Sequence, residues 1–366
     1  MAQNYHSFLD ISVYNRDIKS VQEEIDFTPH SLGYLDYLDK NIDYAVIRFG
    51  ACAEEKPPYF LYRYRFSDLL RLYRLIKSKK NAVALFHGFS FPFRFYLMRA
   101  VFGRKVQWIV QHHAGEPSEN RLKRFIQRKC YALADRYFFV SRQQAESFIA
   151  AGLVSSADRV IEVMECSTAF VMKDKTASRV QLAIDEQQLT FLWVGNLDSN
   201  KDPLCMLRAL AHYRQAGYVF ELYMFFVNDL LLQTVVSFID ANDLGTQVHL
   251  KGKVPNAVLE DWFNAADFFI SCSHSEGSGV AMAEAMACGC VPIVSDIPAF
   301  IRMTGGKTGV IFETGNPDDL FEKLMALDTS GIEQRRAETR QAFVDSLSFE
   351  AIARDTAMAI AGLSQK

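Results

Sequence analysis

The sequence predicts an α/β protein of two Rossmann-like domains, each built on a doubly wound parallel sheet. Short runs of β-branched and aromatic residues alternate with longer segments of helical period, as in strand–helix–strand crossovers. Several of these runs are apolar on both faces, which is typical of parallel strands that helices cover on each side. The alternation runs through the first half of the chain and starts again in the second half, so we expect two sheets.

The first half of the chain contains one series of strand candidates. They are rich in Val, Ile, Phe and Tyr, and helical patterns such as 66–78 and 121–135 separate them. The candidates are residues 8–14, 44–50, 82–87, 106–113, 136–141 and 159–165.

The second half repeats the pattern. Asp202-Pro203 and Asn316-Pro317 each offer an N-cap followed by proline at the first helical position, so helices are expected to begin there. The strand candidates are residues 189–195, 220–227, 247–252, 267–273, 291–296 and 309–313.

Domain boundaries follow from these two series. Residues 173–188 are polar and show neither period, so we expect a hinge there. The predicted domains are therefore 1–172 and 173–345. Residues 346–366 should add a C-terminal helix, over 349–363, whose docking site the sequence does not reveal.

The composition is that of a globular intracellular protein. The chain has 366 residues, 49% of them apolar, and a formal net charge of −3, which excludes the disordered class. The N-terminus lacks a basic segment followed by an apolar one, and no apolar run approaches the roughly 18 residues of a membrane span. Seven cysteines without metal-ligand spacing indicate reduced thiols, so we expect a cytoplasmic protein and no metal site.

Charge is unevenly distributed along the chain. Residues 61–130 contain 16 Lys and Arg against three acidic residues, in basic amphipathic stretches with aromatic side chains. Such stretches favour peripheral contact with an anionic membrane, at the inner face for a cytoplasmic protein, or with an acidic acceptor. The alternative is a solvated helix face on an ordinary domain. No nucleic-acid-binding motif is present, so we expect no nucleic acid partner.

The stretch SHSEGSGVAMAEAMACGCVPIVSD, residues 273–296, holds the most informative motif. Glu276 and Glu284 stand eight positions apart, with small residues and glycines between them, directly after a predicted strand. Glycines let backbone N–H groups approach a ligand, and the start of the following helix favours a phosphate. Either glutamate alone could be an ordinary exposed residue. Together with the glycines, the pair predicts a site in which two carboxylates flank one ligand.

EGSGVAMAEAMACGCVPIVS resembles the Glu-x7-Glu motif of retaining nucleotide-sugar glycosyltransferases with the GT-B fold, the family-4 or group 1 type. The resemblance continues in LWVGNLDSNKDP (192–203), VHLKGKVP (248–255), LEDWFNAADFFISCS (259–273) and KTGVIFETGNPDDL (307–320). It is looser in the first half, where LFHGF (85–89) and WIVQHHAGEP (108–117) carry it. It implies an acceptor-binding domain over 1–172 facing a donor-binding domain over 173–345 across a cleft.

The resemblance also implies roles for single residues. Glu276 would contact hydroxyls of the donor sugar, and Glu284 would hold the ribose hydroxyls of the nucleotide. Lys201 would neutralise the departing diphosphate, and Gly195 would let a phosphate approach the strand end. The remaining donor-site positions are the backbone amides of Gly277, Ser278 and Gly279, the loop of Lys251, Gly252, Lys253 and Val254 near the nucleobase, and Asn196.

A histidine of the first domain should point at the reacting sugar. His113 ends the run WIVQHH and matches the family histidine, but the adjacent His112 competes for the role because strand neighbours point to opposite sides. His87, also at a strand end, fits a structural role at least as well. Two departures stand out: Asn196 occupies a common arginine position, and residues 12–24 lack the family's glycine-rich loop.

The implied reaction moves a sugar from a UDP- or GDP-sugar to a hydroxyl of a glycan or lipid-linked acceptor, with retention, in surface polysaccharide or glycolipid assembly. The chain has no Asp-x-Asp, which fits metal-independent chemistry in which Lys201 and a helix dipole stabilise the leaving group. The alternatives are a sugar-nucleotide-binding protein with weakened catalysis and an epimerase or phosphorylase of the same fold. A dehydrogenase is not expected, because neither domain has G-x-G-x-x-G after its first strand.

Overall fold

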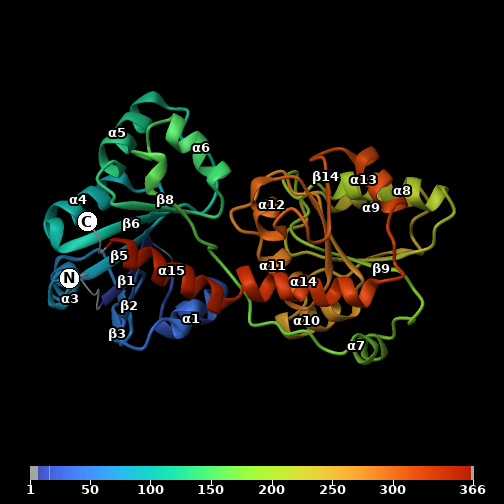
Figure 1. Ribbon diagram of the computed structural model, residues 1–366, viewed down its shortest axis with the longest axis horizontal. Coiled ribbons are helices and arrows are strands. Elements are labelled where there is room, and N and C mark those ends of the chain that lie inside the picture. The colour runs from blue at the N-terminus through green and yellow to red at the C-terminus, as the bar shows by residue number, and fades with distance from the viewer. Residues whose placement is uncertain (1–6, 16, 364–366) are drawn as a thin grey trace. The chain divides into compact units, whose positions relative to one another are not determined.

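The computed structural model describes residues 7–15 and 17–363, and Figure 1 shows its elements. The chain divides into two compact units. The first unit runs to Glu165 and takes up the chain again from Phe349, and the second unit spans Cys166–Ser348. The sequence had suggested divisions at 172/173 and 345/346. Residues 1–6 and 364–366, and Arg16 in the glycine-free segment 12–24, lie outside the described residues.

In the described residues, the first unit has an eight-stranded sheet of order β3-β4-β2-β1-β5-β6-β7-β8. Every pair is parallel except β3 with β4, which is an exception to the predicted all-parallel sheet. The strands are β1 Ser7–Asn15, β2 Asp43–Phe49, β3 Glu54–Lys56, β4 Tyr59–Tyr62, β5 Ala82–His87, β6 Val106–Gln111, β7 Arg136–Phe139 and β8 Val160–Glu162.

The periodicity indicated helices over 66–78 and 121–135; α3 covers the first segment and α5 covers residues 121–131 of the second. Helices α4 and α5 pack against each other. The helices are α1 Val21–Phe27, α2 Pro29–Leu32, α3 Phe66–Ser78, α4 Pro92–Phe102, α5 Arg121–Tyr131, α6 Arg142–Ala150 and α15 Phe349–Leu363, with the 3-10 turns η1 Gly33–Tyr37, η2 Gly103–Lys105 and η3 Ala157–Arg159.

The C-terminal helix α15 docks on η1 of the first unit. The ring of Phe349 stacks on Tyr37 with centroids 6.4 Å apart. It also lies so close to Gly33 that a β-carbon there would be 2.6 Å from Phe349 Cζ. A glycine at position 33 is therefore what lets the chain end pack on the first unit.

The second unit has a six-stranded sheet of order β11-β10-β9-β12-β13-β14 within the described residues, and every pair in it is parallel. This confirms the doubly wound prediction, and each of the twelve strand candidates of the two halves overlaps an observed strand, whereas β3 and β4 were not predicted. The strands are β9 Thr190–Val194, β10 Glu221–Phe225, β11 Val248–Leu250, β12 Phe268–Ser271, β13 Val291–Ser295 and β14 Val310–Phe312.

Two groups of helices cover this sheet. In the first group, α8 packs with α9 and α13. In the second group, α10 packs with α7 and α11, and α11 contacts α14. Figure 1 shows the two groups on opposite sides of the strands. The helices are α7 Lys175–Leu182, α8 Pro203–Gln215, α9 Leu232–Ala241, α10 Asn256–Ala265, α11 Val280–Ala287, α12 Pro298–Thr304, α13 Pro317–Met325 and α14 Ile332–Ser346.

The predicted hinge 173–188 instead contains α7. Asp174 caps this helix by accepting a hydrogen bond from Ala177 N at 2.7 Å. The buried Arg179 donates to the carbonyl of Ala265 at 2.9 Å and to Asp267 at 2.8 Å. The buried face of α7 is provided by the charged Arg179, so the sequence of this helix shows no apolar period. The prediction of a patternless hinge was wrong for this reason.

Candidate functional site

The loops that follow β9 and β12 are neighbours at one edge of the second sheet. The chain places β10 and β11 on one side of β9 and then returns with β12 on the other side. Such a reversal is a topological switch point, beyond which open α/β sheets bind ligands. The predicted residues 195–201 follow β9, and residues 276–284 follow β12. Two separate sequence predictions therefore converge on one position in the fold.

Hydrogen bonds tie the two loops together. The backbone N–H of His274 donates to Asn200 O at 2.8 Å, and the Asn200 amide donates to Ser275 O at 3.0 Å. His274 Nε2 also lies 2.9 Å from Asp202 Oδ2, and Asp202 caps α8 as predicted by accepting from Cys205 N. These backbone and side-chain hydrogen bonds hold the two loops together as one structure.

Lys201 and Glu276 meet in this structure. Lys201 Nζ forms an ion pair with Glu276 Oε1, and both side chains are mostly shielded from solvent. Gly195 makes room for the lysine stem, because a β-carbon at Gly195 would lie 3.4 Å from Lys201 Cγ and 3.3 Å from Trp193. Three predicted site residues, Gly195, Lys201 and Glu276, therefore cluster at the end of β9.

Helix α11 begins at the glycine-rich loop. Gly279 has φ +64° as its N-cap, and a β-carbon there would lie 2.9 Å from Phe300 Cε1, so both backbone and packing require glycine. Ser278 is buried, with Oγ 2.9 Å from Cys166 Sγ. The first backbone N–H groups of α11 come directly after the loop of Gly277, Ser278 and Gly279. The N-terminus of a helix favours a bound anion.

Glu284 is the fifth residue of α11 and only 5% exposed. Burial raises the pKa of Glu284 to about 8. The alternative of an exposed helix residue is therefore wrong for Glu284. Near neutral pH much of this carboxyl group is protonated, and ligand hydroxyls that donate to it would favour its ionised form.

Three other predicted positions are less closely linked to this cluster. Asn196 Oδ1 accepts from the backbone of Asn228 at 3.4 Å, so it helps to join the loop after β9 to the chain after β10. Lys253 is exposed and Val254 half-buried, in the loop after β11, two strands away from β9. Like the cluster, Lys253 and Val254 lie beyond the carboxyl ends of the strands, but on the β11 side of the sheet.

In the first unit, the two adjacent histidines have different surroundings. His112 is buried, its Nε2 donates to Gly115 O at 3.1 Å, and its ring stacks on Phe139. Burial lowers the pKa of His112. The His113 side chain is 30% exposed, and its Nδ1 contacts the Glu165 carboxylate. His113 is therefore the one with a solvent-facing ring.

His87 and Asp10 extend this contact into the first sheet. His87 Nδ1 lies 3.1 Å from His113 Nε2, and His87 Nε2 lies 2.8 Å from Asp10 Oδ1. Arg48 in turn pairs with Asp10 at 2.7 Å and with Glu24 at 2.7 Å. The sequence argument missed Asp10. Its signal was a carboxylate inside the apolar strand FLDISVY, where an unpaired charge would be costly.

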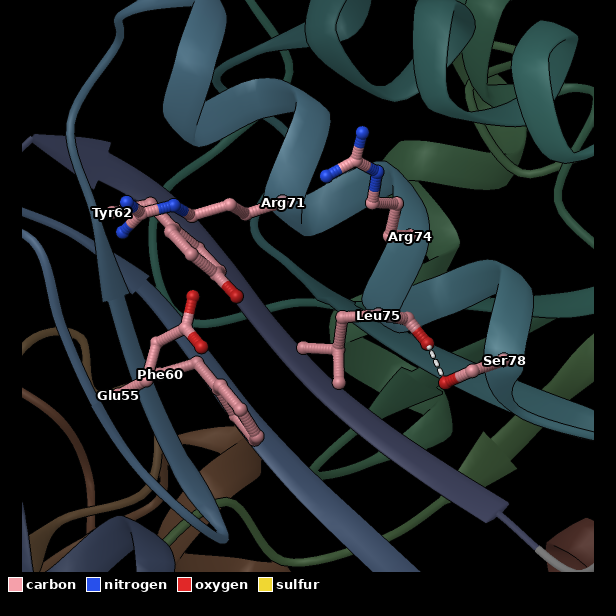
Figure 2. Close-up of a pocket in the computed structure, with 7 residues that line it drawn as sticks. All are labelled: Glu55, Phe60, Tyr62, Arg71, Arg74, Leu75 and Ser78. Atoms are coloured by element: carbon pink, nitrogen blue, oxygen red, sulfur yellow. Dashed lines mark hydrogen bonds between the residues drawn. The ribbon is translucent and has the colours of Figure 1, made fainter.

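The hollows of the first unit include a cavity and a groove. A cavity of about 160 Å³ lies at the ends of β5 and β6, and its lining includes His113, Tyr14 and Lys123. A more open groove of about 410 Å³ lies between β4 and α3 (Figure 2). Arg71 and Arg74 of α3 line this groove, whereas none of the predicted site residues does.

Comparison with known families matches both units. Residues 174–343 match the family described as glycosyl transferases group 1, and residues 37–163 match the glycosyl transferase 4-like domain. Anabaena HepE in complex with UDP and glucose superimposes with a TM-score of 0.71 at 12% identity, covering 98% of this chain and 100% of that one. Sucrose-phosphate synthase from Thermosynechococcus elongatus gives 0.68 at 16% identity, covering 96% and 98%. The fold is the GT-B fold, and the chain belongs to the group 1 glycosyltransferases.

Curated relatives match over shorter stretches. A D-inositol 3-phosphate glycosyltransferase of Arthrobacter sp. (strain FB24) is 26% identical over 167 residues, 44% of this chain and 39% of the relative. A GDP-mannose:cellobiosyl-diphosphopolyprenol alpha-mannosyltransferase of Xanthomonas campestris is 51% identical over 63 residues, 17% of each chain. The matched parts thus span well under half the length of these relatives.

Proposed function

We propose that this transferase moves a sugar from a nucleoside diphosphate to an acceptor hydroxyl with retention of configuration. The observation that carries the proposal is the ion pair of Lys201 with Glu276 in the loops before α8 and α11, followed by the buried Glu284 in α11, at the switch point of the second sheet. A diphosphate between Lys201 and the first N–H groups of α11 would be neutralised by a point charge and a helix dipole. The second unit is therefore the proposed donor-binding domain.

The remaining roles follow from chemistry. Glu276 would bind hydroxyls of the donor sugar once the diphosphate competes for Lys201, and Glu284 would accept from the ribose diol. Gly277 and Ser278 would line the sugar and phosphate, and Lys253 and Val254 would reach the nucleobase from the far side. His113 would face the sugar from the first unit. The leaving phosphate would take the acceptor proton, which needs neither a protein nucleophile nor a metal ion.

Donor binding and transfer test this proposal together. Calorimetry with UDP, GDP and their sugars should give saturable binding that Glu284→Ala weakens, because a buried partner of the ribose hydroxyls is lost. With an accepted sugar, proton NMR of the product should show the anomeric configuration of the donor. Binding of every nucleotide that is equal in wild type and Glu284→Ala would refute the donor site.

Asn196 favours a second candidate, a nucleotide-binding protein with weakened catalysis. Its side chain is neutral where the family commonly has an arginine, and it bonds to Asn228 N. Tight nucleotide binding with no transfer to any acceptor would favour this candidate. Free nucleoside diphosphate released together with a glycosylated acceptor would exclude it, and would also exclude an epimerase or a phosphorylase.

The acceptor is proposed to be a glycan or a lipid-linked glycan at the cytoplasmic face of a membrane. The relative from Xanthomonas campestris has a diphosphopolyprenol acceptor in its name, and the first unit exposes apolar side chains among basic ones. None of the helices in the described residues has the length and apolar character needed to cross a bilayer. Contact with the membrane would therefore be peripheral, as part of surface polysaccharide or glycolipid assembly.

The proposed membrane surface consists of α3, α4 and α5. Phe93 and Leu97 lie four residues apart on α4 and are 62% and 60% exposed, and Leu122 and Phe125 of α5 are also exposed. Helix α5 packs on α4, and Tyr73 of α3 stacks on Phe102 of α4 with centroids 5.8 Å apart.

Basic residues accompany these apolar side chains. Arg71 and Arg74 follow the exposed Leu69 and Leu70 on α3, and α5 alone carries Arg121, Lys123, Arg124, Arg128 and Lys129. Apolar side chains flanked by cations are the expected form of a surface that binds anionic lipid.

A further inference from the structure

We propose that Asp10 and His87 are positioning residues that hold a proton between the rings of His87 and His113, so that His113 meets its cavity as an imidazolium cation. That this charge acts on a reacting sugar rests on the function proposed above. The proton itself follows from donor and acceptor counting within the first unit.

The four side chains form an unbroken line. Glu165 contacts His113 Nδ1, His113 Nε2 lies 3.1 Å from His87 Nδ1, and His87 Nε2 lies 2.8 Å from Asp10 Oδ1. The two imidazole planes differ by only 4°. Each of the three gaps between these side chains is therefore short enough to hold one hydrogen bond.

Counting protons shows that one more is needed than the neutral groups supply. An ionised carboxylate only accepts, so His113 Nδ1 must donate to Glu165 and His87 Nε2 must donate to Asp10. A neutral imidazole has one N–H. With both rings neutral, two lone pairs would face each other across the 3.1 Å gap between His113 and His87. A third proton in that gap makes all three hydrogen bonds and gives the pair one positive charge.

The surroundings decide which ring carries this charge. Burial lowers the pKa of His87 below its ordinary value, so His87 is the neutral ring. Burial also disfavours charge on His113, but the Glu165 carboxylate outweighs it and raises the pKa of His113. For Asp10, burial is opposed by the hydrogen bond from His87 and by the Arg48 guanidinium, which hold the pKa of Asp10 well below its usual range. A neutral His87 beside Asp10 and a charged His113 beside Glu165 thus form the middle of the line.

Other charged or titratable groups reach this line from every neighbouring element. Arg48 adds a positive charge beside Asp10, and Glu24 balances it from α1. Tyr34 of η1 donates to Asp10 Oδ2 at 3.4 Å. The other titratable groups that line the cavity of His113 are His112, Tyr14, Glu116 and Lys123.

Both nitrogens of His113 act as donors in this arrangement. His113 therefore has no lone pair with which to take a proton from an acceptor hydroxyl, and its contribution to the reaction is charge. This agrees with a mechanism in which the leaving phosphate takes the acceptor proton. Because the pKa of His113 is raised, its charge is kept to higher pH than in an ordinary histidine and is lost as the pH rises further, which predicts an alkaline limit to activity.

Nitrogen NMR of the full chain with ¹⁵N-labelled histidine tests the proton directly and needs no activity. At pH 7, His113 should show two protonated nitrogens, whereas His112 should be neutral with its proton on Nε2. The signals are assigned with His112→Asn and His113→Asn. A neutral His113 at pH 7 would overturn the inference, whatever becomes of the proposed reaction.

The positioning role is tested by the pH dependence of kcat/KM. Asp10→Asn and His87→Phe should move the alkaline limb to lower pH, because each removes a group that holds the proton. Tyr34→Phe is the matched control: it removes a buried hydroxyl that touches Asp10 but changes no charge, and should leave the limb in place. If the buried substitutions prevent folding, Glu165→Gln at the more accessible end should give the same displacement. An unmoved limb in a folded variant would overturn the role.

Discussion

Lys201 and Glu276 lie 75 residues apart in the sequence and form an ion pair where the second sheet reverses its strand order. Their side chains are 24% and 13% exposed, so the pair is partly withdrawn from water. In the proposed donor complex, a diphosphate would compete with Glu276 for the lysine. Glu276 would then be released toward the donor sugar, so a single exchange of partners would prepare both side chains for their proposed roles.

Substitution of either partner should separate binding from turnover. Lys201→Ala should weaken UDP or GDP binding and lower kcat by about 10²- to 10³-fold, since it removes a charge that stabilises the leaving group. Glu276→Gln should lower kcat while nucleoside diphosphate binds at least as tightly, because Lys201 no longer has a competing carboxylate. Calorimetry with the diphosphates and steady-state kinetics measure the two effects.

Lys307→Ala is the control for this pair, because Lys307 is an exposed lysine of the same unit. It should change neither quantity. Weaker diphosphate binding in Glu276→Gln would contradict the exchange of partners.

Glu284 should make the stability of the protein depend on pH. Its pKa is raised by burial from 4.5 to about 8, so the folded state favours the protonated form. The associated stability is fully present below pH 4.5 and is lost as the pH rises toward about 8, by an order of magnitude of a few kcal/mol. Thermal unfolding should therefore show Glu284→Gln gaining stability over wild type as the pH is raised from about 5 to 9.

The comparison is read from the difference in Tm between the two proteins at each pH, which cancels the titration of all other groups. A difference that is constant from pH 5 to 9 would show that Glu284 titrates normally. Saturating nucleotide should reduce this difference, because the ribose hydroxyls would stabilise the ionised carboxylate.

Gly279→Ala should damage the donor site locally. The residue has φ +64°, and the new β-carbon would lie 2.9 Å from Phe300 Cε1, so the loop or the phenyl ring has to shift. We expect a loss of about 1–3 kcal/mol in the free energy of unfolding and weaker nucleotide binding. Gly245→Ala is a matched control, since no atom lies within 4 Å of a β-carbon at Gly245. Equal stability and binding in the two variants would contradict the packing argument.

Most strands and their order of appearance could be predicted because buried parallel strands are largely apolar. Phe268–Ser271 and Val291–Ser295 are examples, and the segment between them carries Glu276 in a loop and Glu284 in α11. These residues were selected by their position after a strand together with the glycines between them and the resemblance to the Glu-x7-Glu motif, and a parallel sheet brings all such loops to one edge. By contrast, β3 has the sequence EEK, and its exposed edge position leaves no apolar signal.

What the sequence did not reveal depends on contacts between distant charged residues. Asp10 and His87 are 77 positions apart, and their contact follows from the pairing of β1 with β5. Arg179 made α7 look patternless for the same reason, since its partner Asp267 lies 88 positions further along the chain. Buried charges of this kind can be suspected from a strand that contains one, but their partners require the fold.

The proposed membrane surface gives a prediction that is independent of catalysis. Phe93→Ser combined with Leu97→Ser should weaken binding to vesicles that contain phosphatidylglycerol by at least about tenfold, because each side chain would lose a burial worth about 1.5–3 kcal/mol. Arg71→Ala with Arg74→Ala should also weaken binding, by about 1 kcal/mol per charge at low salt, with little effect at high salt. Sedimentation with anionic and with neutral vesicles measures both.

The matched control lies in the second unit, where Val227 and Leu230 are 70% and 75% exposed but belong to no basic stretch. Val227→Ser with Leu230→Ser removes comparable exposed apolar area and should leave vesicle binding unchanged. If that variant lost as much binding as the α4 variant, exposed apolar area in general would be responsible and not the surface of α3, α4 and α5. Equal binding of wild type to neutral and anionic vesicles would remove the role of its basic residues.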